Sequence, residues 1–205
     1  MNVIFFMKSY LQKNIIEYFP SNDTTFWIPI YDTNESRIIQ DFILFYFENR
    51  NFNFIQIDNY QSVSSSIAHT LLQIHKEMNN NPFFIYNSDV ILNPICYDLN
   101  SNYIHTNINA SFNNYLGICF INDSVIFWDK LNKLYKENKL NPNLNELMVL
   151  KEMSINYIVS NNFLKHEFDN DILFFENEKE NEEYVYENKN DLVKYSIYFC
   201  KKKLI

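Results

Sequence analysis

The stretch Phe83-Phe84-Ile85-Tyr86-Asn87-Ser88-Asp89 decides the fold class of this chain. Its first four residues are apolar and follow the turn-forming run 79–82, which predicts a short buried strand with three polar residues at its carboxyl end. The residues just before the turn predict an amphipathic helix, because apolar side chains recur there at steps of four, three and four: Ile67, Leu71, Ile74 and Met78.

The alternation of helix and strand continues in both directions from this point. Further strands are predicted at 2–7, 52–57, 117–121, 156–159 and 195–200, and further helices at 36–49, 123–135 and 144–153. Ser36 and Asp123 are the expected helix caps. Strands that alternate with helices of this length favour right-handed crossovers onto a largely parallel sheet. We therefore expect one α/β domain over residues 1–205, a Rossmann-like sandwich with a mostly parallel central sheet flanked by helices.

Three segments break this regular pattern. Residues 27–30 contain Pro29 and predict a short irregular or edge segment, because proline cannot donate to a ladder of hydrogen bonds. Residues 93–114 are rich in asparagine and predict irregular structure. Residues 167–191 are strongly acidic and predict a solvated, mobile face of the domain.

Composition excludes several classes of function. The net charge of −8 and the dispersed cations argue against a nucleic-acid partner. Gly117 is the single glycine, so no Gly-rich phosphate loop can form. Three cysteines without CxxC spacing indicate buried thiols in a reducing compartment, and no apolar run is long enough for a membrane span. We expect a cytoplasmic protein, whose apolar content leaves room for a homo-oligomer face that the sequence does not locate.

Asp89 is the leading candidate for chemistry. In an open α/β sheet, ligands bind beyond the carboxyl ends of the strands, so a carboxylate that ends a buried strand holds a favoured position. A hard oxygen ligand there suits Mg²⁺ or Mn²⁺, which would bridge the phosphates of a nucleotide. The alternative is that Asn87 and Asp89 only turn the chain, as Asn and Asp commonly do.

A family resemblance supports the first interpretation. The blocks 64–72 and 80–89 resemble the centre of the sugar-phosphate nucleotidyltransferases of surface-polysaccharide pathways, in which a small-residue turn opens a helix and the next strand ends in Asn-Gly-Asp or Asn-Ser-Asp. Other pieces follow in the order of that family: Ile28-Pro29-Ile30, residues 37–47, Leu116-Gly117-Ile118-Cys119-Phe120 and Asn143-Leu144-Asn145-Glu146.

The resemblance implies a fold of GT-A type and assigns roles to particular residues. Asp89 would hold Mg²⁺ or Mn²⁺, with Asn87 and Ser88 shaping its loop. Ser64, Ser65 and Ser66 would flank the base of the nucleotide. Glu146 would contact the sugar, and Gly117 belongs to the segment that lines the substrate. The implied partners are a nucleoside triphosphate or nucleotide-sugar and a sugar substrate.

The chain departs from that family at the triphosphate loop. Where the family has glycines and an arginine after the first strand, this sequence has Met7-Lys8-Ser9-Tyr10-Leu11-Gln12-Lys13. Loss of those donors puts ordinary pyrophosphorylase activity in doubt. Two alternatives stay open: a small GT-A glycosyltransferase that uses a nucleoside-diphosphate-sugar donor and Asp89, and a binding or scaffold protein that has kept the fold without the chemistry.

Overall fold

The computed structural model describes residues 1–6, 10–12, 16, 19, 23–59, 62, 65–87, 91–92, 99–107, 109–159, 163–164 and 172–174. Seven strands form the central sheet, in the order β4-β3-β1-β5-β8-β7-β9. These strands are β1 (Asn2–Phe6), β3 (Thr25–Ile30), β4 (Asn51–Gln56), β5 (Phe83–Asn87), β7 (Tyr103–Thr106), β8 (Tyr115–Ile121) and β9 (Asn156–Val159). Two small antiparallel pairs lie outside it: β2 (Tyr10–Gln12) with β11 (Ile172–Phe174), and β6 (Ile91–Leu92) with β10 (Phe163–Leu164).

The direction of the strands defines two edges of the sheet. Every strand pair in the sheet is parallel except those that involve β8, which runs against both of its neighbours, β5 and β7. The carboxyl ends of the other six strands therefore meet the amino end of β8 along one edge, which we call the carboxyl edge. The opposite edge is the amino edge. The predicted α/β class with a mostly parallel central sheet is confirmed.

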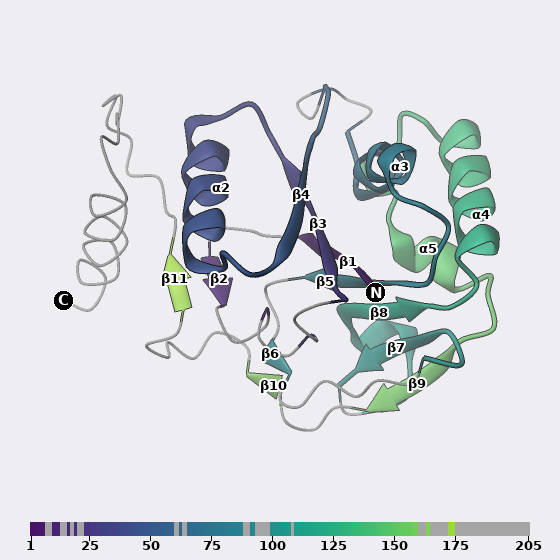
Figure 1. The fold of residues 1–205 in the computed structure, drawn as a ribbon. Coiled ribbons are helices and arrows are strands. Elements are labelled where there is room, and N and C mark those ends of the chain that lie inside the picture. Colours follow the sequence, from purple (N-terminus) through teal and green to yellow (C-terminus); the bar gives the residue numbers. More distant parts are fainter. Residues whose placement is uncertain are drawn as a thin grey trace.

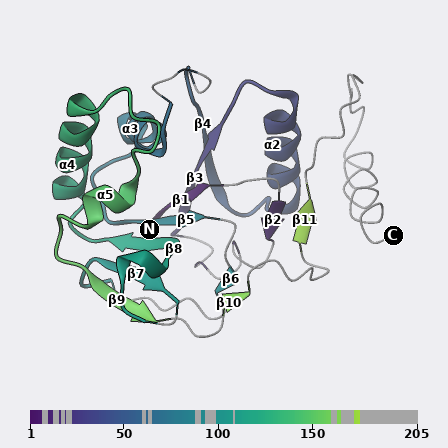
Figure 2. The same cartoon turned by 180° about the vertical axis from the view of Figure 1, so that it is seen from behind.

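Helices cover both faces of the sheet (Figures 1 and 2). Helix α2 (Asn34–Tyr46) covers one face, where Ile43 and Phe47 join an aromatic core around Phe26, Phe84 and Phe120. The other face packs against α3 (Ile67–Glu77), α4 (Ser124–Glu137) and α5 (Glu146–Leu150), and its core contains the side chains Ile85, Ile104, Cys119 and Trp128. We call this second face the α3 face. Burial of both faces explains why the central strands are almost uniformly apolar.

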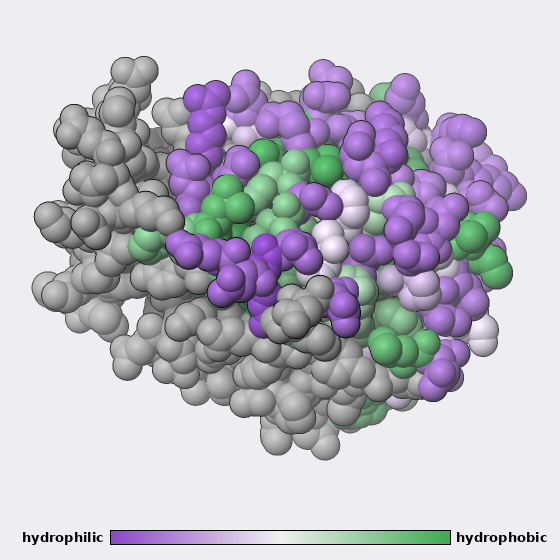
Figure 3. Space-filling model, viewed as in Figure 1, coloured by the Kyte–Doolittle hydropathy of each residue, from purple (hydrophilic) through white to green (hydrophobic). Residues whose placement is uncertain are grey.

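Polar residues cover most of the described surface, with apolar residues near the middle of the view in Figure 3. Strand β4 forms one border of the sheet, and it alternates exposed asparagines with half-buried Phe52 and Phe54. No helix in the described part of the chain is long and apolar enough to cross a membrane.

Pro29 lies within a paired strand, contrary to the sequence prediction. Strand β3 pairs with β4 along its whole length, but with β1 only from Thr25 to Trp27. The carbonyl of Ile30 accepts from Ile57 N–H on the β4 side, at 2.9 Å. Because neighbouring residues in a strand point their polar groups to opposite sides, Pro29 faces the β1 side beyond the end of that pairing. Its missing N–H therefore costs no ladder bond.

The asparagine-rich segment is also more ordered than predicted, since it contains β7 and the short 3₁₀ helix η1 (Phe112–Asn114). Helix α5 is shorter than the predicted 144–153. The predicted strand 156–159 is confirmed as β9. Within the acidic segment 167–191, β11 is a described strand; the rest of that segment and the predicted strand 195–200 lie outside the described residues.

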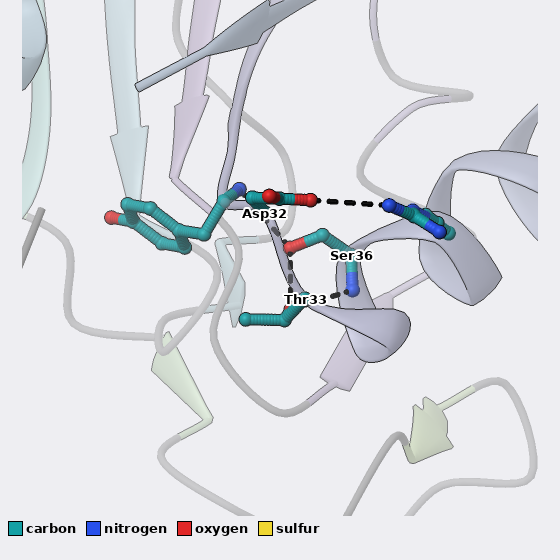
Figure 4. A network of polar contacts seen from close by, with 5 residues as sticks. Asp32, Thr33 and Ser36 are labelled. Atoms are coloured by element: carbon teal, nitrogen blue, oxygen red, sulfur yellow. Dashed lines mark hydrogen bonds and ion pairs between the residues drawn. The ribbon is translucent and has the colours of Figure 1, made fainter. Parts of the chain in front are cut away.

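Helix α2 is capped by Thr33 and not by Ser36 (Figure 4). The Thr33 hydroxyl accepts from Ser36 N–H at 3.1 Å, and the Ser36 hydroxyl accepts from Tyr31 N–H at 3.1 Å. Arg37 pairs with Asp32 at 3.2 Å, but the two side chains are 71% and 75% exposed. An ion pair so open to water contributes little to stability, so the hydroxyls hold this end of the helix.

Candidate functional site

Three polar or small positions gather on the α3 face at the carboxyl edge. Side chains alternate between the faces of a sheet, so a residue two positions from a core residue lies on the same face. Asn87 follows Ile85 on β5 by two positions, and Gly117 precedes Cys119 on β8 by two. Thr106 follows Ile104 on β7 across an irregularity of the register with β8, and is placed by its pairing with Tyr115, which packs against the same core. The antiparallel direction of β8 brings its first residues beside the last residues of its neighbours. The register pairs Thr106 directly with Tyr115.

Gly117 allows Asn87 to come close to β8. Its φ of +79° lies in the left-handed region that side chains disfavour. A Cβ added at Gly117 would lie 2.9 Å from Cβ of Asn87, which is closer than such atoms approach in proteins. The single glycine of the chain thus lies on β8 beside the end of β5, where a side chain would collide with Asn87.

Glu146 comes to the same place from α5. It is the first residue of that helix and only 7% exposed. Helix α5 follows a loop that is tied to α3, because Ala68 N–H donates to Leu144 O at 3.0 Å. The phenol of Tyr115 donates to Oε1 of Glu146 at 3.2 Å. Burial raises the pKa of Glu146, which favours the neutral acid.

Several buried polar atoms at this edge have no hydrogen-bonding partner in the described structure. They are Oγ1 of Thr106, Oδ1 of Asn107, Oδ1 of Asn145 and Oε2 of Glu146. Buried polar atoms are nearly always paired, so a group of unpaired ones at one strand edge calls for an explanation. Their chemistry suits a ligand rich in hydroxyls. Each of these atoms is enclosed, so such a ligand reaches them by displacing a neighbouring group.

The serine turn is mainly a helix cap. Ser66 is the N-cap of α3, and its hydroxyl accepts from His69 N–H at 3.1 Å. Ser65 N–H donates to Ser62 O at 2.9 Å. Ala68 N–H also has an acceptor, Leu144 O. The amides of Ala68 and His69 in the first turn of α3 are therefore not available to bind an anion. Ser64 lies outside the described residues, and the predicted contact of the three serines with a base stays a prediction.

His69, next to this turn, is held in one tautomer. Gln73 exchanges two hydrogen bonds with the backbone of Asp58, at 2.9 and 3.1 Å, which fixes its amide with nitrogen toward the histidine. That nitrogen lies 2.8 Å from Nε2 of His69, so Nε2 accepts and Nδ1 carries the hydrogen. The ring stacks on Tyr135, and burial lowers its pKa. His69 is therefore a packed side chain in its neutral form.

The metal prediction rests on residues beyond those described. Ser88 and Asp89 lie outside them, so of the tripeptide only Asn87 can be placed. No group of three or more His, Cys, Asp or Glu side chains suited to a metal occurs within the described ranges. The described donors therefore do not by themselves make a metal centre, and the role of Asp89 stays a prediction.

Sequence reasoning picked out Asn87, Gly117 and Glu146, and the structure places all three at the carboxyl edge of the α3 face. It missed Thr106 and Tyr115. Thr106 falls in the segment expected to be irregular, and Tyr115 is one of 15 tyrosines in a chain whose aromatic residues read as core. Only the pairing of β7 with β8 brings these two together.

No protein-family model and no curated protein matches the chain. Among solved structures, the fold is similar to a nucleoside-diphosphate-sugar pyrophosphorylase from Vibrio cholerae RC9, with a TM-score of 0.55 and 8% identity over 85% of this chain and 95% of that one. A UDP-glucose pyrophosphorylase complexed with UDP-glucose gives a TM-score of 0.48 at 11% identity, covering 98% of both chains. The glycosyltransferase GlyE of Streptococcus pneumoniae TIGR4 gives 0.45 at 15% identity over 77% of this chain and 44% of that one. At these identities, the first match shows a shared fold.

Proposed function

We propose that this protein is a nucleotide-sugar enzyme of the sugar-phosphate nucleotidyltransferase type, with its sugar site at the carboxyl edge of the α3 face. One observation carries the proposal. Glu146 is buried at that edge with one oxygen held by Tyr115 and the other without a described partner. A fold that encloses an acid in this way loses stability, and a bound ligand offers a reason to keep it.

The groups at the edge suit a sugar better than a phosphate. They are an amide, a hydroxyl and a carboxyl group whose pKa is raised by burial: Asn87, Thr106 and Glu146. Such groups donate and accept hydrogen bonds to hydroxyls, whereas phosphate binding relies on cations and on amides such as those at a helix start. The similarity in fold to a nucleoside-diphosphate-sugar pyrophosphorylase supports the same substrate class.

Asp89 gives the proposal its chemistry. It follows Asn87 by two residues, just past the end of β5. A carboxylate there would hold Mg²⁺ or Mn²⁺, which neutralises charge on the phosphates of the nucleotide. Gly117 supports this arrangement, because a side chain in its place would push Asn87, and with it the start of the Asp89 loop, away from β8.

A glycosyltransferase that uses a nucleoside-diphosphate sugar is the second candidate. The specific observation in its favour is the single glycine, which leaves no Gly-rich loop for a triphosphate. It would use the same sugar site and the same Asp89. It differs in binding a nucleotide-sugar in preference to a nucleoside triphosphate.

A thermal-shift panel of nucleoside triphosphates, nucleotide-sugars and sugar phosphates, each with and without Mn²⁺, tests both candidates. Ligand binding to the folded state raises the melting temperature. We expect a metal-dependent rise that is lost in Asp89→Asn and weakened in Glu146→Gln. The matched controls are Asp129→Asn and Glu152→Gln. Asp129 lies on α4 and Glu152 follows α5, both are exposed, and these two variants should leave the rise in melting temperature unchanged.

The preferred ligand chooses between the two candidates. A larger rise with a triphosphate supports the nucleotidyltransferase, and a larger rise with a nucleotide-sugar supports the glycosyltransferase. A cooperatively melting protein that responds to no ligand would exclude both, and would leave the binding or scaffold protein.

A further inference from the structure

We propose that Tyr115 is a positioning residue of the sugar site, whose hydroxyl holds Oε1 of Glu146 and so presents Oε2 to a hydroxyl of the ligand. This inference rests on the proposed function and names a residue that the family resemblance does not assign. Its basis is the contact between the start of β8 and the start of α5, two elements that approach each other only in the folded chain.

The phenol of Tyr115 is the donor in its hydrogen bond to Glu146. Burial raises the pKa of Tyr115 well above its ordinary value, so the phenol keeps its proton. The phenol therefore donates to Oε1 of Glu146, as the 3.2 Å contact indicates. A hydrogen bond at one oxygen restricts the rotation of the carboxyl group, and so limits the directions in which Oε2 can point.

The surroundings of the pair are neutral. Cys119 lies two residues beyond Gly117 on the same face of β8, and burial raises the pKa of its thiol, so it stays protonated. Tyr115 and Cys119 are the titratable side chains that act on Glu146 in the described structure, and no cation there offsets its charge. Recognition of a ligand by Glu146 thus depends on hydrogen bonding, for which orientation matters more than charge.

Tyr115 itself is placed by the sheet. Its backbone pairs with Thr106 at the end of β7, and its ring packs beside the α3-face core. A phenylalanine keeps the ring and the pairing, and removes only the hydroxyl. Tyr115→Phe therefore separates the hydrogen bond to Glu146 from the packing of the strand.

The test measures ligand affinity in a double-mutant cycle with the best ligand of the panel above. Tyr115→Phe is expected to weaken affinity about tenfold, as loss of a hydrogen bond to an acid would. Glu146→Ala, which removes the acceptor of Tyr115, is expected to weaken it as well, and the double variant is expected to bind no more weakly than Glu146→Ala alone. Tyr157→Phe, on the exposed strand β9, is the matched control and should leave affinity unchanged.

The pH profile of binding gives a readout that packing alone would not move. Donation by Tyr115 favours the charged form of Glu146. Loss of the phenol hydroxyl should therefore raise the pKa of Glu146 and move the pH dependence of binding to higher pH. The shift should be absent in Tyr157→Phe and in any variant that carries Gln at position 146.

Each outcome decides the matter. Unchanged affinity in Tyr115→Phe, or additive losses in the double variant, would overturn the inference and leave the proposed function standing. If the unmodified protein binds no ligand, both fail together. If Tyr115→Phe alone does not fold, the double variant, which carries no buried acid, is compared with Glu146→Ala: equal affinity supports the inference and weaker affinity overturns it.

Discussion

The two edges of the central sheet differ in how fully their buried polar side chains are paired, although one hydroxyl at the amino edge, that of Thr24, also has no described partner. At the amino edge, Asn102 is 4% exposed and uses its whole side chain: its oxygen accepts from the N–H groups of Asn122 and Asp123, at 2.8 and 3.0 Å, and its amide nitrogen donates to Asp123 and to Ser154 O. At the carboxyl edge, Thr106, Asn107, Asn145 and Glu146 each bury a polar atom that has no described partner.

A second asparagine network shows the same contrast. Asn2, at the start of β1, accepts from Trp27 Nε1 and donates to Asn79, both at 3.1 Å. At the amino edge, Asn2 and Asn102 thus stabilise the fold through hydrogen bonds. At the carboxyl edge, four buried polar atoms have no described partner, which lowers stability and, under the proposed function, leaves groups for a ligand to bind. The predictions below test this difference, beginning with the largest effect.

The largest loss should come from the saturated edge. Asn102→Ala removes four hydrogen bonds and leaves two part-buried N–H groups without this acceptor, so the free energy of unfolding should fall by about 3 kcal/mol. Asn156→Ala, which loses one exposed bond to Ser101, is the control and should change it by less than about 0.5 kcal/mol. Urea unfolding measures both, and equal effects would contradict the contrast between the edges.

Acid should weaken the fold through His105. Burial lowers the pKa of this side chain from 6.5 to about 4. The unfolded chain therefore takes up a proton as the pH falls below 6.5, whereas the folded protein does so only near pH 4. The contribution of neutral His105 to the free energy of unfolding is therefore complete above pH 6.5. About 3 kcal/mol is lost as the pH falls from 6.5 to about 4. In His105→Gln this part of the pH dependence of unfolding should vanish; an unaltered profile would show that His105 is not its source.

Gly117→Ala should lower the free energy of unfolding by about 2 kcal/mol, because it combines a positive φ with a collision against Asn87. Asn59 offers a matched control, since it also has a positive φ, of 55°, but is exposed. Asn59→Ala should cost about 1 kcal/mol or less. The difference between the two losses in the free energy of unfolding measures the cost of the contact with Asn87. Ligand binding should be weakened only in Gly117→Ala.

The smallest expected change in stability has the opposite sign. Burial raises the pKa of Glu146 above 4.5, so its contribution to stability is full below pH 4.5 and is lost as the pH rises through its folded value. Glu146→Gln keeps an acceptor for Tyr115 and removes the acid, so it should raise the melting temperature at pH 7.5 and leave it unchanged at pH 4. A lower melting temperature at pH 7.5 would show that the acid supports the fold.

Sequence patterns predicted much of the fold because its main elements carry their own signals. Helix α3 and strand β5 are recognisable from periodicity and from the turn between them. Strand β7 is not, because its four residues are buried on both faces and stand among asparagines, so neither alternation nor composition marks them. The place of Pro29 depended on where β1 stops pairing with β3, which only tertiary structure decides.

The site was predictable in part for a similar reason. Asn87 and Glu146 stand in motifs that resemble those of a known family, and the place of Asn87 at the carboxyl edge follows from the parallel strands. Tyr115 could not be found from sequence, because its partner lies 31 residues away on an element whose direction is set by the fold. The reversal of β8 brings the two together.

The reversed direction of β8 also affects how freely the segment between β7 and β8 can vary. The connection from Thr106 to Tyr115 leaves the sheet at the carboxyl edge and returns to it at the same edge. This connection does not have to cross a face of the sheet, whereas a connection between parallel strands does. Its length and sequence are therefore less constrained. An exchange of this short segment would remodel the wall beside Tyr115 while every strand kept its register. Under the proposed function, variants with an altered sugar preference are expected to differ in this segment.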